Sequence, residues 1–93
     1  MTSMFTVSPM GDDRLVIDDR SAVPSYQQLA AQLRERIIAG RIEPGTVLPS
    51  ITQLTGETGL AVNTVRRAVA VLADEGYVVV VPGRGTYAAD KLP

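Results

Sequence analysis

The sequence of 93 residues contains neither cysteine nor histidine. Without cysteine it forms no disulfide and offers no thiolate ligand to a metal, which fits a protein of the reducing cytosol. Without histidine it lacks the commonest metal ligand and the usual general base of enzymes. No convergent set of acids and nucleophiles replaces them. We therefore expect no enzymatic activity, no cofactor and no metal site.

Long apolar runs are also missing. Stretches such as the four valines at 78–81 fall far short of the roughly 20 apolar residues that a membrane-spanning helix requires. The N-terminus has no basic flank leading into an apolar run, which a secretory signal would have. We therefore expect a cytoplasmic protein without a membrane partner.

The chain lacks an excess of positive charge as well. Nine basic residues stand against ten acidic ones, for a formal net charge of −1, which gives no overall attraction to nucleic acid. Four acids precede residue 20, at positions 12, 13, 18 and 19, without the glycine-centred loop of a calcium site. Between residues 26 and 87, six arginines outnumber five acids by one. Any surface for DNA must therefore be local.

The spacing of apolar residues predicts three helices. Over residues 25–39, apolar side chains recur at helical intervals. A second, short helix begins after Ser50, which can form a capping box with Gln53, and ends near Gly59. The glycine allows a sharp turn, and a third helix follows over residues 62–75.

Runs of β-branched residues predict short strands. Residues 77–81 and 86–88 flank a tight turn at 82–85, which predicts a β-hairpin. The simplest interpretation of residues 78–81 is a buried strand, and the alternative is that an exposed part of it supports dimerisation. Residues 46–48 form a short β segment between the first two helices. Residues 14–18 are expected to form an extended piece that packs on the domain.

Three helices followed by a hairpin predict an α+β fold, the winged helix-turn-helix, in which the hairpin is the wing. We expect this domain over residues 23–89. A flexible N-terminal segment over 1–22 precedes it, with its first ten residues or so mobile, and a short tail over 90–93 follows.

Five short motifs follow one another along the chain. They are residues 24–26 (Pro-Ser-Tyr), 43–50 (Glu-Pro-Gly-Thr-Val-Leu-Pro-Ser), 63–68 (Asn-Thr-Val-Arg-Arg-Ala), 72–77 (Leu-Ala-Asp-Glu-Gly-Tyr) and 83–87 (Gly-Arg-Gly-Thr-Tyr). In this order and spacing the motifs resemble the DNA-binding domain of the GntR family of bacterial transcriptional regulators. The resemblance covers about residues 22–89. It implies that the chain binds double-stranded DNA, with the third helix in the major groove and the wing at the neighbouring minor groove.

The resemblance also implies which residues contact DNA. These are Ser50, Thr52, Val62, Asn63, Thr64, Arg66, Arg67, Gly83, Arg84 and Gly85. By resemblance, Ser50 would offer its hydroxyl or its backbone N–H to a phosphate. Asn63, Thr64 and Arg66 would lie on the exposed N-terminal face of the third helix. Gly83 would let the backbone of the wing approach the groove closely.

The chain departs from the family pattern at three positions. The family usually has a basic residue where this chain has Thr52, a serine or threonine where it has Ala61, and an arginine where it has Val62. Arginine is the commonest reader of guanine edges, so we expect weaker binding by each monomer and a different operator. The effector-binding, dimerising domain usual in the family does not follow the wing here. We interpret the chain as a stand-alone DNA-binding module or a shortened form, and we predict no small-molecule effector.

The candidates on the third helix also have structural interpretations. Arg66 and Arg67 would otherwise form a solvated helix face. Asn63 and Thr64 would otherwise cap the helix in place of the family's serine or threonine. The position of Arg66 soon after the turn favours DNA contact for Arg66 more than for Arg67.

The remaining candidates have similar alternatives. Ser50 would otherwise be only a helix cap, and the glycines of the 82–85 turn would only supply positive φ. This turn joins two strands, so it is not a phosphate-binding loop, which leads from a strand into a helix. Arg84 at its tip is suited to a narrow minor groove, where the potential is strongly negative.

Two functions are left open by the sequence. The leading hypothesis is a sequence-specific transcriptional repressor that binds a pseudo-palindromic operator as a homodimer, at least on DNA. The alternative is a winged-helix protein-interaction module with little DNA affinity, whose interface lies along residues 78–81 or the N-terminal segment. The low charge and the loss of basic residues at Thr52 and Val62 favour the alternative, whereas the wing and the family resemblance favour the first.

Overall fold

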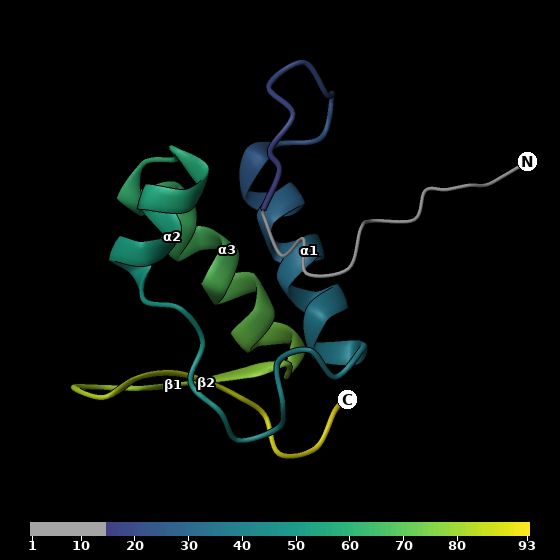
Figure 1. Ribbon diagram of the computed structural model, residues 1–93, viewed down its shortest axis with the longest axis vertical. Coiled ribbons are helices and arrows are strands. Elements are labelled where there is room, and N and C mark those ends of the chain that lie inside the picture. The colour runs from purple at the N-terminus through teal and green to yellow at the C-terminus, as the bar shows by residue number, and fades with distance from the viewer. Residues whose placement is uncertain (1–14) are drawn as a thin grey trace, which may run out of the picture.

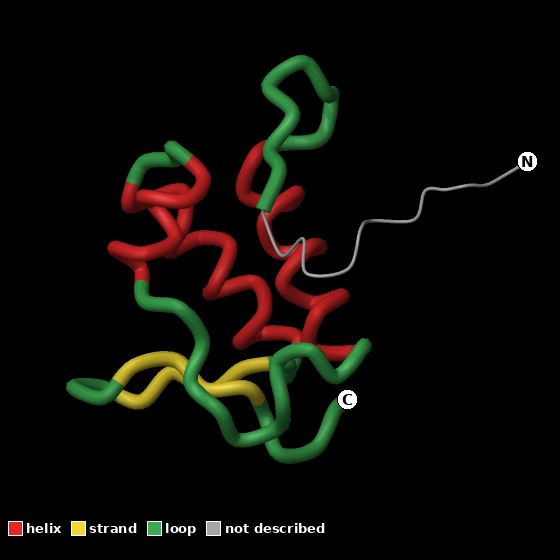
Figure 2. The backbone as a smooth tube through the Cα atoms, in the orientation of Figure 1, coloured by secondary structure: helices red, strands yellow, loops and turns green. Residues whose placement is uncertain are grey.

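The computed structural model describes residues 15–93, so the mobility predicted for the first ten residues lies outside the described part. Three helices and a hairpin follow one another as α1 (Ser25–Ile38), α2 (Ile51–Thr58), α3 (Val62–Glu75), β1 (Val78–Val81) and β2 (Gly85–Ala88). In Figure 1, α1 and α3 run side by side, and the hairpin lies across the far end of α3. Figure 2 shows the turn of the hairpin pointing away from α1. This order confirms the predicted winged helix-turn-helix.

Two glycines in the left-handed conformation end α2 and α3. Gly59 has a φ of 75° and Gly76 a φ of 88°, a region in which side chains with a Cβ are strained. Because the chain reverses at Gly59, only residues 59–61 separate α2 from α3. The predicted bounds of the third helix are confirmed, and α1 ends at Ile38, one residue before the predicted end.

The core lies where the three helices meet. Its largest fully buried side chains are Leu29, Leu33, Leu54, Leu72 and Val65. α1 and α3 each bury four residues, whereas Leu54 is the buried residue of α2. Leu54 therefore anchors the eight-residue α2, with the half-buried Ile51 packed against the core beside it. A helix this short needs such packing, because it is not stable by itself.

The wing is a small antiparallel sheet. β1 pairs with β2 in a register that runs from Val78 opposite Ala88 to Val81 opposite Gly85. The predicted β segment at residues 46–48 joins the other edge of β2, through a bridge between Val47 and Tyr87 and a backbone hydrogen bond of 2.7 Å from Leu48 to Thr86. β1 is consequently an edge strand.

The prediction that the first wing strand is buried is wrong for its middle residues. Val78 is buried, but Val79 and Val80 are each 52% exposed. Val79 points away from the helices, because successive side chains of a strand alternate between its two faces. Val80 faces α3 again, but it lies closer to the tip, where the core has ended and only an open cleft remains.

The segment before α1 packs on that helix through two glutamines. Leu15 is buried and joins the core, which confirms that the described part of this segment packs on the domain. The side-chain amide of Gln32 accepts from the backbone N–H of Val16 at 3.0 Å and donates to its carbonyl at 2.6 Å. Gln28, one turn earlier, bonds the backbone N–H and carbonyl of Asp18 in the same way, at 2.8 and 2.9 Å. The side-chain amides of Gln28 and Gln32 thus form the backbone hydrogen bonds that a neighbouring strand would otherwise form.

Leu54→Ala tests the attachment of α2. Its side chain is completely buried, so the substitution should lower the free energy of unfolding by about 2–5 kcal/mol. The measurement is urea unfolding followed by circular dichroism. Leu92→Ala is the matched control, because Leu92 is 42% exposed and its loss should change stability by less than about 0.5 kcal/mol. Equal effects of the two substitutions would contradict the role of Leu54.

Candidate nucleic-acid interface

The start of α2, the exposed side of α3 and the wing meet at one face, which is hollowed by two clefts. The first cleft, of about 430 Å³, lies between the start of α2 and the wing, and the second, of about 280 Å³, lies between α3 and the wing. Ile51 and Thr86 line both clefts, so the two are adjacent. Ser50, Thr52, Arg84 and Gly85 line the first, and Arg66 lines the second. Tertiary structure thus brings together candidates from three separate segments.

Ser50 forms the predicted capping box at the start of α2. Its Oγ accepts from the backbone N–H of Gln53 at 3.0 Å, and its own backbone N–H donates to Oε1 of Gln53 at 2.8 Å. The backbone N–H expected to reach a phosphate is therefore already used. The hydroxyl proton of Ser50 is the donor that the capping box leaves available. Thr52, in the first turn of α2, has an exposed side chain.

The structural alternative for Asn63 and Thr64, that they cap α3, is excluded. The cap position is Ala61, and no side chain caps the helix. Asn63 and Thr64 are already helical, so neither has the extended backbone that a capping residue requires. The first N–H groups of α3 are therefore left without a side-chain partner. Val62, where an arginine was expected by resemblance, is 46% exposed at the same end.

An exposed stripe runs along α3. Its residues are Asn63, Arg66, Arg67, Ala70 and Asp74, spaced at the intervals of one helix face. The opposite face is buried in the core. Asp74 is the first acid of α3, and the wing strands with their turn contain no acid. Up to Asp74, the charges on this helix and on the wing are thus all positive.

The side chains of Arg66 and Arg67 extend from this stripe toward different neighbours. Consecutive residues of a helix point about 100° apart. Arg66 lies toward the wing, in the cleft that Val80 and Thr86 also line. Arg67 lies toward α1, with its Cζ 4.1 Å from the centre of the Tyr26 ring. Nothing in the sequence spacing of Tyr26 and Arg67 indicated this contact.

The wing tip presents one exposed cation. Arg84 is exposed, and its backbone N–H closes the turn by donating to the carbonyl of Val81 at 3.0 Å. Gly83 has a φ of 78°, and a Cβ at this position would meet no atom within 4 Å. Within the domain, the positive φ requires a glycine at position 83, whereas the space around it does not. This agrees with the interpretation that the glycines of the turn supply positive φ.

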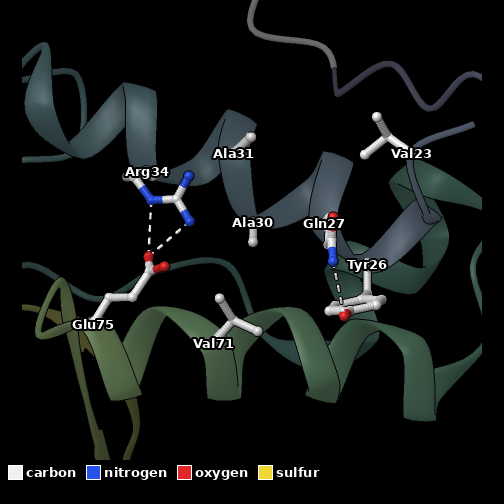
Figure 3. A pocket seen from close by; sticks show the side chains of 8 residues that line it. All are labelled: Val23, Tyr26, Gln27, Ala30, Ala31, Arg34, Val71 and Glu75. Atoms are coloured by element: carbon white, nitrogen blue, oxygen red, sulfur yellow. Dashed lines mark hydrogen bonds and ion pairs between the residues drawn. The ribbon is translucent and has the colours of Figure 1, made fainter. Parts of the chain in front are cut away.

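The groove between α1 and α3 lies apart from the two clefts. Figure 3 shows Arg34 of α1 paired with Glu75 of α3, and the Tyr26 ring lying over α3 at the other end of the groove. The ion pair joins Nη2 of Arg34 to Oε1 of Glu75 at 2.7 Å. Glu75, next to Asp74 near the wing, is thus partly neutralised by a cation from α1.

Other kinds of site find no support in residues 15–93. Within this part of the chain, no group of three or more acidic, histidine or cysteine side chains is arranged to hold a metal ion. No helix in it is long and apolar enough to cross a membrane.

The sequence and the fold were compared with known proteins. The profile of a family described as "Bacterial regulatory proteins, gntR family" matches residues 25–88. The HTH-type transcriptional repressor YtrA of Bacillus subtilis is 38% identical over 75 residues, which are 81% of this chain and 58% of YtrA. The chain therefore spans little more than half the length of that relative.

Two solved structures have a similar fold. YtrA from Sulfolobus acidocaldarius, a GntR-family transcription factor, superposes with a TM-score of 0.77 at 37% identity, covering 84% of this chain and 82% of that one. The DNA-binding domain of AraR, in complex with operator ORX1, superposes with a TM-score of 0.76 at 28% identity, covering 82% of this chain and 96% of that one.

Ser50→Ala tests the capping box. The loss of the cap should lower the free energy of unfolding by about 0.5–2 kcal/mol, because the N–H groups at the start of α2 lose their side-chain partner. Urea unfolding provides the measurement. Glu57→Ala, an exposed substitution near the other end of α2, is the control and should cost less. A Ser50→Ala protein as stable as the wild type would show that solvent replaces the cap without loss.

Proposed function

Because the chain belongs to the gntR family of bacterial regulatory proteins, we propose that it binds duplex DNA at specific sequences and regulates transcription. The observation that carries this proposal is the face on which the exposed start of α3 lies beside the wing. Before Asp74, the charged residues of α3 are Arg66 and Arg67, and the charged residue of the wing is Arg84. The similar fold of the AraR domain, solved with its operator, supports the same use of this face.

In this proposal, α3 enters the major groove, whose width of about 12 Å admits one helix. The exposed stripe faces the bases, so Asn63 and Arg66 supply amide and guanidinium donors to base edges. Val62 offers an apolar contact of the kind that recognises a thymine methyl group. Thr64 is only half exposed, and we assign it to the rim of the contact.

The other candidates contact the DNA backbone and the minor groove. The hydroxyls of Ser50 and Thr52 donate to phosphates at the rim of the first cleft. Arg84 enters the minor groove from the wing tip, with Gly83 and Gly85 carrying no side chain that would obstruct it. A guanidinium gains most where the minor groove is narrow, so A·T-rich flanking sequence is expected there.

We further propose that two copies bind one operator. A single domain of this size makes few base contacts, and paired half-sites related by a two-fold axis double them. Repression follows where such an operator overlaps a promoter, and the Bacillus subtilis relative is named a repressor. Sedimentation of the protein with a duplex carrying one or two half-sites tests the pairing, since two copies on each full operator are expected.

The proposed function is tested by selecting duplexes from a randomised pool with the 93-residue chain. Fluorescence anisotropy then compares the selected duplex with a scrambled one at several salt concentrations. A preference on the order of 10³-fold is expected for a specific regulator. About three to five phosphate contacts for each copy predict a logarithmic salt slope of roughly −3 to −4.5 per copy. Equal, weak binding to both duplexes would overturn the proposal.

The exposed valines of β1 favour a second candidate function. Val79 and Val80 are half exposed on an edge strand, and such an edge can accept a strand from another protein. In this case a protein partner would be retained in salt that releases DNA. Val79→Lys would abolish that complex, whereas operator binding through α3 would remain.

Arg66→Ala tests the assignment of base contact. The substitution should weaken operator binding by about 1–3 kcal/mol and relax the preference for one base of the selected sequence. Anisotropy on single-base variants of the operator gives both quantities. Arg20→Ala, which removes the same charge from the segment before α1, is the control and should leave the base preference intact. Unchanged affinity in Arg66→Ala would exclude this residue from the interface.

A further inference from the structure

The contact between Tyr26 and Arg67 joins α1 to the exposed side of α3. Arg67 has an exposed side chain, and its Cζ lies 4.1 Å from the centre of the Tyr26 ring. This distance corresponds to a guanidinium close against the face of the ring. A second pair, Arg34 and Tyr77, is much looser at 5.7 Å. Of these two pairs, only the Tyr26 contact involves an arginine of α3.

The Tyr26 ring is itself held in place. It is half buried and packs against the edge of the core. The side-chain Nε2 of the neighbouring Gln27 donates to its Oη at 3.0 Å, as Figure 3 shows. Packing and this hydrogen bond together limit the orientations of the ring, so the guanidinium on it is restricted as well.

The guanidinium of Arg67 keeps donors for a ligand. A guanidinium has five N–H donors, and the contact with the Tyr26 ring uses none of them in a hydrogen bond. Within residues 15–93, no carboxylate pairs with Arg67. A restricted cation with available in-plane donors fits a phosphate, which accepts two parallel hydrogen bonds from a guanidinium.

We propose that Tyr26 is a positioning residue, which holds Arg67 toward α1 so that its guanidinium binds a DNA phosphate at the wall of the major groove opposite Arg66. This inference rests on the proposed function, and it adds the start of α1 to the interface. Arg67 then contributes affinity without sequence preference, because phosphates carry no sequence information. Arg66, on the other side of α3, contacts bases.

The experiment measures anisotropy of the 93-residue chain on its selected operator and on a scrambled duplex, from low to moderate salt. Arg67→Ala should make the logarithmic salt slope less negative by about 0.9 for each copy. Its ratio of operator to scrambled affinity should stay unchanged. Tyr26→Leu, which keeps an apolar side chain but removes the ring, should weaken binding roughly two- to fivefold at low salt. Tyr26→Phe should restore most of the wild-type affinity, because the ring and its packing remain and only the hydrogen bond from Gln27 is lost.

The double substitution separates positioning from a general effect on the fold. If Tyr26 acts through Arg67, Tyr26→Leu causes no further loss in the Arg67→Ala background. Circular dichroism confirms that each variant is folded, and Lys91→Ala, in the exposed tail after β2, corrects for the loss of one positive charge elsewhere. Additive losses, an unchanged Tyr26→Leu protein, or an altered operator preference in Arg67→Ala would each overturn the inference while the proposed function stands. A wild-type chain without operator preference would overturn both.

Discussion

The packing of α3 against α1 is the constraint on which the rest of the molecule depends. Leu29 and Leu33 of α1 meet Val65 and Leu72 of α3 in a fully buried contact. This contact fixes the rotation of α3 about its own axis and thereby decides which residues face outward. Since side chains of one helix cannot be turned independently, burial of one stripe exposes the stripe with Asn63, Arg66 and Arg67.

The low net charge is compatible with a local cationic face because the wing and α3 up to Asp74 contain no acid. Glu75, at the other end of α3, is paired with Arg34. Charges farther away than about 10 Å are largely screened at ordinary salt. A ligand at the start of α3 and the wing therefore meets mostly the nearby arginines.

Much of the fold could be predicted from the sequence, because the deciding signals are local. Apolar spacing located α1 and α3, and the Ser50 and Gln53 pair located the start of α2. The glycine at position 59 marked the turn between α2 and α3. The prediction that the first wing strand is buried was wrong for its middle residues, because a run of four valines does not indicate where the core ends. The alternative in which Asn63 or Thr64 caps α3 could not be excluded from the sequence for a related reason, since the exact first residue of a helix depends on how the preceding turn closes.

The sequence by itself determined the elements, their order and the residue types of the candidate interface, since periodicity, capping and turn chemistry act over a few neighbouring residues. Only the tertiary structure decided how these residues are grouped. It placed Ser50, Thr52 and Arg84 around one cleft and Arg66 in the next. It also sent Arg67 to Tyr26, a residue 41 positions earlier in the chain. Contacts between distant residues arise from helix packing, and no local pattern specifies them.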